Sequence, residues 1–132
     1  MKLTPNPAPF RFSLGDRGEM AACGFLKEKG YAILEKNYKC KIGEIDVIAR
    51  RNGRLAFVEV KTRTGTGFGM PQEAVDRKKQ EKIFKLAEWY IKEKKLETIP
   101  VAFDVVAVLW KEGGAPEMRL ITDAYEKEDK AY

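Results

Sequence analysis

The sequence predicts a single α/β domain built from two amphipathic helices and five strands. Apolar residues recur with helical spacing in two segments, residues 16–29 and 74–95. Between and after these segments lie runs rich in β-branched and aromatic residues, separated by glycine and asparagine turns. A chain of 132 residues that is 44% hydrophobic and 34% charged can bury one core of ordinary size.

The first helix is expected over residues 16–29, with Gly30 as its C-terminal cap. Its buried stripe begins at Glu19 and continues through Ala22, Cys23 and Leu26. Two roles are open for Glu19. Asp16-x-x-Glu19 has the form of a capping box, with both carboxylates matching the helix dipole, and the spacing alone favours this role. A carboxylate at the head of a buried stripe can also belong to a functional site.

Residues 31–40 form the first expected strand, with a bend at Asn37. The next two strands lie within residues 43–63, on either side of Asn52-Gly53. That dipeptide suits a two-residue turn because both residues tolerate positive φ. The sequence therefore predicts a β-hairpin over residues 43–63.

Charged residues interrupt the apolar strands of this hairpin. Because side chains alternate between faces, one face of the second strand should carry Glu59 and Lys61, and one face of the first should carry Glu44, Asp46 and Ile48. Such a hairpin gathers two or three carboxylates and an ammonium group, which a divalent metal ion and an activated water need. The competing interpretation is a solvated face with weak cross-strand ion pairs. The pattern alone does not decide between them.

Residues 62–72 contain three glycines and Pro71, which predicts an irregular loop that is functional or mobile. The second helix is expected over residues 74–95, with Asp76 as its N-cap. Its start is basic, a pattern that usually marks a solvated face. Its buried stripe contains Ile83, Leu86, Ala87, Tyr90 and Ile91, and Lys79 and Gln80 extend it toward the helix start.

Residues 101–110 are nearly continuous apolar sequence, which predicts a central strand buried on both faces. Asp104 interrupts this strand, and a buried carboxylate must be paired or serve a purpose, so a structural and a functional role are both open. Gly113-Gly114 then turns into a short strand over residues 118–121. Around a domain of residues 15–122 we expect a flexible arm over residues 1–14 and a frayed tail over residues 123–132.

The composition excludes several kinds of site. The chain has no histidine, which rules out Ser-His-Asp and Cys-His catalysis and leaves carboxylates, lysine and a hard cation for hydrolysis. Cys23 and Cys40 lack the spacing of a zinc site and suit a reducing cytosol. We expect a cytoplasmic protein, since no apolar run approaches the roughly 20 residues of a membrane span and residues 1–10 lack a signal core. With 25 basic and 20 acidic residues, the net charge of +5 favours an anionic partner.

Seven short stretches spread over residues 18–106 carry a resemblance to a known group of proteins. They are Gly18-Glu19-x-x-Ala22, Gly30-Tyr31-x-Ile33-Leu34, Gly43-Glu44-Ile45-Asp46, Phe57-Val58-Glu59-Val60-Lys61-x-Arg63, Phe68-Gly69-x-Pro71, Ala74-Val75-Asp76-x-x-Lys79 and Phe103-Asp104-Val105-Val106. Together they resemble the PD-(D/E)xK nuclease superfamily. More narrowly, they resemble the YraN family of uncharacterised bacterial endonuclease-like proteins, which are similar to Holliday junction resolvases. The resemblance implies a restriction-endonuclease-like core, a mixed β-sheet flanked by α-helices.

The resemblance also implies a catalytic and metal site. Asp46 matches the first metal-binding acid of the superfamily, Glu59 the second, and Lys61 the lysine of the motif. The superfamily's proline before the first Asp is replaced here by Ile45. The two carboxylates and the carbonyl of Val60 can hold Mg²⁺ or Mn²⁺ while leaving positions open for water and a phosphate oxygen.

Further residues carry over to catalysis and to nucleic-acid binding. Glu19 matches a helix-1 carboxylate of resolvase-like members, and Gln80 matches a site-facing glutamine of related nucleases. The implied function is a Mg²⁺-dependent DNA endonuclease acting on branched or structured DNA as a homodimer, with no membrane or small-molecule cofactor. The alternatives are a non-catalytic DNA-binding or protein-interaction module on the same fold, and an RNA-directed nuclease. The residues expected to contact phosphates are Arg63, Arg77, Lys78, Lys79 and Lys82.

Overall fold

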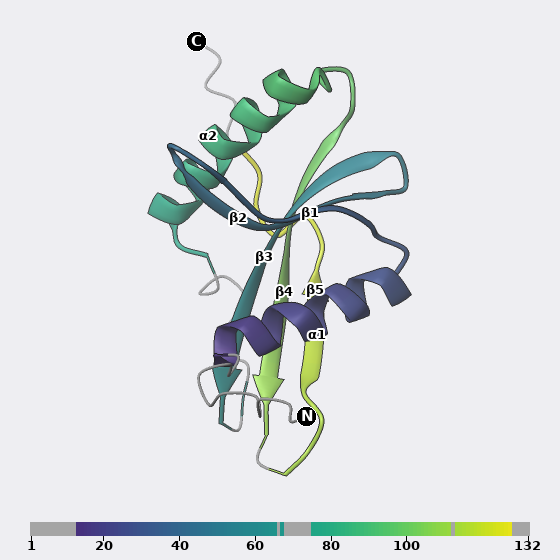
Figure 1. Cartoon of the computed structure of the whole chain (residues 1–132), viewed down its shortest axis with the longest axis vertical. Coiled ribbons are helices and arrows are strands. Elements are labelled where there is room, and N and C mark those ends of the chain that lie inside the picture. The colour runs from purple at the N-terminus through teal and green to yellow at the C-terminus, as the bar shows by residue number, and fades with distance from the viewer. Residues whose placement is uncertain (1–12, 66, 68–74, 112, 128–132) are drawn as a thin grey trace, which may run out of the picture.

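The structure is a computed structural model that describes residues 13–65, 67, 75–111 and 113–127. The strands pair in the order β1-β2-β3-β4-β5 as one mixed sheet, parallel between β3 and β4 and antiparallel elsewhere (Figure 1). The predicted α/β class and the predicted order of elements are both confirmed. The elements are α1 (Leu14–Glu28), β1 (Ala32–Cys40), β2 (Gly43–Arg51), β3 (Arg54–Thr64), α2 (Arg77–Lys94), β4 (Val101–Trp110) and β5 (Glu117–Ile121).

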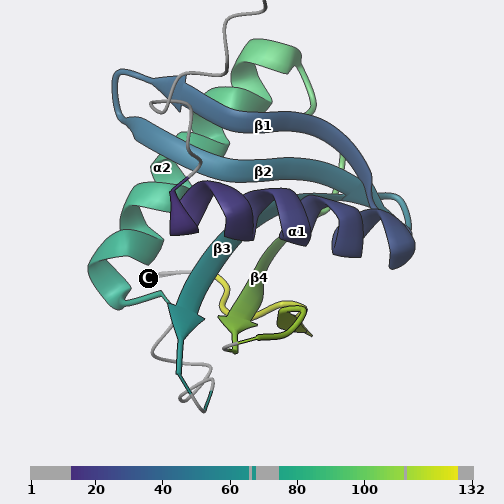
Figure 2. The ribbon, with the colours of Figure 1, turned by 60° about the horizontal axis from the view of Figure 1, so that its bottom comes forward.

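The two helices cover opposite faces of the sheet (Figures 1 and 2). Val58 and Val106 pack in the core beneath α1, whereas their neighbours Phe57 and Val105 pack in the core beneath α2. Because adjacent residues supply opposite cores, β3 and β4 are buried from both sides, as predicted for residues 101–110. Within the described ranges, neither helix is long and apolar enough to cross a membrane.

Helix α1 begins earlier than expected, because Ser13 is its N-cap. The Ser13 hydroxyl accepts a hydrogen bond from the Asp16 amide at 3.0 Å, and the Asp16 carboxylate accepts one from the Ser13 amide at 3.3 Å. These reciprocal bonds form a capping box. The predicted box of Asp16 and Glu19 is therefore wrong, and Glu19 lies beyond the first turn. At the other end, Gly30 takes up a φ of +94°, consistent with its predicted capping role.

Strand β2 changes faces part-way along its length. Ile45 and Ile48 both belong to the core beneath α2, whereas Val47 belongs to the core beneath α1. Strict alternation would have placed Ile45 and Val47 together. The expectation that Glu44, Asp46 and Ile48 share one face is therefore wrong, because the alternation breaks at Asp46.

Strand β1 turns at the same level. Asn37 has a φ of +51°, and the residues on either side of it pair with the residues on either side of Asp46. The predicted bend at Asn37 thus lies opposite the break in β2, and the β1–β2 hairpin curves from one face of the sheet toward α2 (Figure 1). The predicted Asn52-Gly53 turn between β2 and β3 is confirmed, with φ values of +53° and +75°.

The segment after β3 differs from expectation in its boundaries. β3 continues through Thr64, so the irregular stretch expected from residue 62 begins later than predicted. Residues 66 and 68–74 lie outside the described residues, and the loop prediction falls largely on them. α2 begins at Arg77 rather than residue 74, because Asp76 is its N-cap, as predicted. The Asp76 carboxylate accepts a hydrogen bond from the Lys79 amide at 2.8 Å.

Asp104 has a structural role. Its buried carboxylate accepts hydrogen bonds from the Tyr31 hydroxyl at 2.6 Å and the Asp123 amide at 2.9 Å. The Arg51 guanidinium donates to the same Tyr31 oxygen at 3.1 Å. The tail expected from residue 123 is therefore packed at its start, and the Tyr125 ring stacks on an aromatic ring of β4 at 5.5 Å.

Candidate metal and nuclease site

Two carboxylates meet where β2 and β3 separate. The paired register of these strands ends at Val47 and Val58, and the next residues along, Asp46 and Glu59, face each other beyond it. Asp46 Oδ2 accepts a hydrogen bond from the Val60 amide at 2.8 Å. A side chain thus takes the place of the missing strand partner, and the break in alternation leaves the Asp46 carboxylate at the seam between the strands.

Glu59 is buried, with 4% of its surface exposed. Its Oε2 lies 3.0 Å from Lys79 Nζ of α2, whereas its Oε1 is buried and has no hydrogen-bond partner in the described structure. Burial and then the Asp46 charge raise the pKa of Glu59 to about 7, against the opposing effect of Lys79. Burial also raises the pKa of Asp46, while the Val60 amide and Lys79 oppose the rise. The environment therefore favours a bound cation or proton at this acid pair (Asp46 and Glu59).

Glu19 approaches Asp46 from α1. Both residues line a cavity of about 330 Å³ between α1 and the bend of the β1–β2 hairpin. With its amide oriented to give both groups a partner, Asn37 donates to Glu19 Oε1 at 2.8 Å and to Glu44 Oε1 at 3.2 Å. Burial and then the charges of Asp46 and Glu44 raise the pKa of Glu19, while the Asn37 hydrogen bond lowers it. Glu19 therefore lies with the acidic residues of the sheet rather than in the helix cap.

Gly18 allows α1 to come this close to the sheet. It is buried, and a methyl group added at this position would overlap the Thr62 side chain of β3. Gly24, on the same helix, has open space around it. Because Glu19 directly follows Gly18, the close approach to Thr62 sets the position of Glu19 relative to Asp46.

Within the described structure, neither Lys61 nor Gln80 forms a hydrogen bond or an ion pair with Asp46 or Glu59. Lys61 is exposed and has no ion-pair partner within the described ranges. The Gln80 amide nitrogen donates to the Val75 carbonyl at 2.9 Å, next to the start of its own helix. Catalytic roles for both residues stay predictions.

Within the part of the chain that the structure describes, the cation in contact with the acid pair is Lys79. From the sequence, Lys79 was predicted only to extend the buried stripe of the second helix and to contact phosphates. Lys79 precedes the core residues Ile83 and Leu86 by four and seven residues, which fixes it on the side of α2 that faces the sheet. That spacing was the available signal, but only the fold shows that Glu59 lies opposite.

The other expected phosphate-binding residues lie on α2 and near the end of β3. A hollow of about 530 Å³ lies between the start of this helix and Ile42 in the turn of the β1–β2 hairpin. Arg77 begins the helix, and Arg63 is half-buried near the end of β3. Lys79 contacts Glu59 and also lines the hollow, so it links the two features. The expected phosphate-binding residues that line the hollow are Lys78, Lys79 and Lys82.

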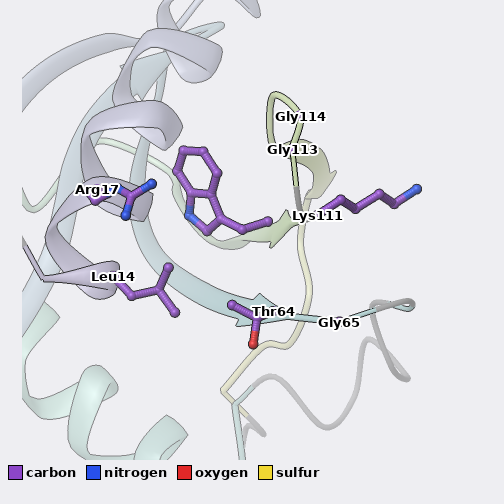
Figure 3. Close-up of a pocket in the computed structure, with 8 residues that line it drawn as sticks. Leu14, Arg17, Thr64, Gly65, Lys111, Gly113 and Gly114 are labelled. Atoms are coloured by element: carbon purple, nitrogen blue, oxygen red, sulfur yellow. The ribbon is translucent and has the colours of Figure 1, made fainter.

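A larger hollow of about 850 Å³ lies elsewhere, at the carboxyl ends of β3 and β4. Figure 3 shows Leu14, Arg17 and Thr64 around it. The Arg17 guanidinium lies 4.9 Å from the ring centroid of Trp110, which also lines the hollow. None of its described lining residues is a carboxylate. The volume of this hollow would favour it as the functional site, but the carboxylates that could bind a metal ion are at the acid pair.

The donor set of the acid pair fits a hard divalent cation. Asp46 and Glu59 offer carboxylate oxygens, one of them the unpartnered Oε1. In a strand the carbonyl of a residue points to the same side as its amide, so the Val60 carbonyl faces Asp46 as the amide does. Among the described residues, no three Cys, Asp or Glu side chains form a preformed metal cluster. The remaining coordination positions would therefore fall to backbone, water or phosphate oxygens.

Comparison with known proteins places the chain within a family. Residues 18–108 match the profile of the uncharacterised protein family UPF0102. The chain belongs to this family. A UPF0102 protein of Geotalea daltonii is 46% identical over 114 residues, which cover 86% of this chain and 90% of the relative. Another, of Caldanaerobacter subterraneus subsp. tengcongensis, is 51% identical over 96 residues, 73% of this chain and 79% of the relative. UPF0102 is the YraN family, so the resemblance to that family is confirmed. The match to the UPF0102 profile spans the acid pair, Glu19 and all of α2.

Gly18→Ala should destabilise this UPF0102 protein by about 1–3 kcal/mol, because the added methyl group forces α1 away from Thr62. Gly24→Ala is the matched control. It places the same methyl group in open space on the same helix and should stabilise the protein by about 0.5–1 kcal/mol. Urea unfolding measures both changes. Two variants of equal stability would contradict the close approach at Gly18.

Proposed function

We propose that this UPF0102 protein is a Mg²⁺- or Mn²⁺-dependent DNA endonuclease of the cytoplasm that hydrolyses phosphodiester bonds in branched or otherwise structured DNA. The observation that carries the proposal is the acid pair, two carboxylates held together at an opening in the sheet. Burying like charges side by side is unfavourable unless a cation or a proton compensates them. A site of this kind is therefore suited to a positively charged ligand, and the superfamily resemblance supplies the reaction.

The residues of the site have separate roles in this reaction. Asp46, Glu59 and the carbonyl of Val60 would hold the metal ion, with water and a phosphate oxygen free to complete its ligand set. When bound, such an ion would lower the pKa of a water and would offset the negative charge that builds on phosphorus. Lys61 orients the nucleophile or stabilises the transition state from its exposed position on β3. Glu19 adds a carboxylate on the α1 side of Asp46.

Substrate binding falls to the basic side chains around the acid pair. Lys78 and Lys82 line the hollow beside α2 and are exposed, so they can reach phosphates without moving the backbone. Arg63 and Arg77 extend this surface along β3 and the start of the helix. Two copies of the chain acting as a homodimer would present two sites to two strands, which is the arrangement that the resemblance to resolvases implies.

A second candidate function is a non-catalytic DNA-binding module. The observation that favours it is the ion pair between Lys79 and Glu59, because this pair compensates one buried carboxylate without a metal ion. A module of this kind would bind DNA through the same basic surface and would be indifferent to Mg²⁺. Fold alone does not decide between the two.

Removing either member of the acid pair should separate the two functions. Asp46→Ala and Glu59→Ala should abolish metal-dependent cleavage and leave the fold intact, because each removes a metal ligand. Lys61→Ala should slow cleavage by about 10²–10³-fold and retain metal binding. The measurement incubates four-way junctions, flaps and linear duplexes with Mg²⁺ or Mn²⁺, with calorimetry of metal binding alongside. The nuclease assignment fails if the wild type cuts none of these substrates or structured RNA, and binds neither ion.

Glu19→Ala tests whether the α1 carboxylate belongs to the reaction. It should reduce cleavage, with a change in stability below about 0.5 kcal/mol, because the capping box does not use Glu19. Ser13→Ala is the matched control on the same helix. It removes the true N-cap and should cost about 0.5–2 kcal/mol of stability while cleavage persists. The opposite outcome, normal cleavage by Glu19→Ala, would remove Glu19 from the site.

The basic surface makes a prediction about salt. If Arg77 and Lys78 meet phosphates, the logarithm of duplex affinity should fall with the logarithm of salt concentration by about 0.9 per contact. The double variant Arg77→Ala/Lys78→Ala should flatten that slope. Lys92→Ala/Lys94→Ala removes two charges from the other end of α2 and should leave it unchanged. Fluorescence anisotropy at several salt concentrations measures the slopes, and equal slopes for all three proteins would reassign Arg77 and Lys78 to a solvated face.

A further inference from the structure

The described structure brings one ammonium group into contact with the acid pair. Lys79 Nζ lies 3.0 Å from Glu59 Oε2, while Glu59 Oε1 has no hydrogen-bond partner. The Lys79 charge also acts on Asp46, where it opposes the rise in the pKa of that carboxyl. A metal ion held by Glu59 Oε1 would therefore lie beside an ammonium group on the other oxygen of the same carboxylate.

The two members of this ion pair differ in their freedom to move. The Glu59 side chain is 5% exposed and stands on a strand buried from both faces, whereas the Lys79 side chain is 54% exposed. The ammonium sits on a flexible four-carbon stem. The backbone of Lys79 is held separately, because its amide donates to the Asp76 carboxylate at the helix start. The ammonium group can leave Glu59 without disturbing α2, but the carboxylate cannot follow it.

We propose that Lys79 is an internal counter-ion of the acid pair, which a divalent metal ion displaces and which then contacts a phosphate of the bound nucleic acid. This inference rests on the proposed function, because it takes Asp46 and Glu59 as the metal ligands. Two cations at one carboxylate repel each other, so a metal ion that takes the unpartnered Oε1 weakens the hold of Oε2 on the ammonium group. Once displaced, the ammonium group remains beside the hollow that Lys79 lines with Lys78 and Lys82, where phosphates are expected.

This arrangement couples the two ligands. A metal ion releases a positive charge toward the nucleic acid, and a phosphate that holds Lys79 keeps it from competing for Glu59. By linkage, each ligand then strengthens the binding of the other by the same factor. The share of the coupling that Lys79 carries disappears when the ammonium group is removed, although the metal ligands remain.

The test measures the affinity for Mn²⁺ without nucleic acid, by isothermal titration calorimetry. Lys79→Met should bind Mn²⁺ at least about tenfold more tightly than the wild type, because the competing cation is gone. Lys85→Met is the matched control, since Lys85 is exposed on the same helix and lines the same hollow. Its affinity should stay within about threefold of the wild type. Equal affinities of Lys79→Met and the wild type would overturn the inference.

A second measurement uses the wild type, so it holds even if Lys79→Met does not fold. Lysine acetylation is mapped by mass spectrometry with and without Mn²⁺. Mn²⁺ should raise the reactivity of Lys79 relative to Lys85, and a DNA junction added to the Mn²⁺-bound protein should lower it again. Unchanged Lys79 reactivity in a sample that calorimetry shows to be metal-bound would overturn the displacement. A wild type that binds neither Mn²⁺ nor Mg²⁺ and cuts none of the substrates overturns the proposed function as well, which distinguishes the two failures.

Discussion

The repulsion between Asp46 and Glu59 is the constraint on which the rest of the structure depends. A carboxylate that is 4% exposed and faces another is unfavourable unless each negative charge is compensated. The compensation comes from different elements. The Val60 amide of β3 donates to Asp46, and the Lys79 ammonium of α2 pairs with Glu59. Because no single element supplies both partners, the acid pair is tolerable only when the sheet and α2 are in place together.

The strands and the helix next to the two carboxylates depart from regular structure. β2 stops pairing with β3 beyond Val47, and it changes faces at Asp46. The opposite residue in β1, Asn37, adopts a left-handed conformation that most residues avoid. On the face of the sheet covered by α1, the absence of a side chain at Gly18 allows α1 to approach β3. Local departures of this kind concentrate at functional sites, where the surrounding structure holds them in place.

Much of the fold could be read from the sequence, because it depends on local signals, whereas the choice of Asp46 and Glu59 as site residues came from the family resemblance. Asn52-Gly53 located the hairpin, and Asp76 located the start of α2. The strict alternation failed at Asp46, because the change of face needs Asn37 on the neighbouring strand, and pairing between strands is not a local property. The capping box failed for another reason. Ser13 and Asp16 have the same spacing as Asp16 and Glu19, so the motif alone fits both.

The role of Lys79 shows where local reasoning ends. Its helical spacing indicates the side of α2 on which it lies, but its partner is 20 residues earlier in the chain, on a strand whose depth only the packed sheet sets. A proton could also compensate the acid pair, and burial favours that outcome at Glu59. Lys79 opposes it, so the ammonium group keeps Glu59 closer to the ionised form that a metal ligand must have. If a metal ion displaced a proton from Glu59, the proton would pass to solvent and its charge would leave the site. An ammonium group displaced from Glu59 stays attached beside it, and its charge remains available to the substrate that the metal ion would act on.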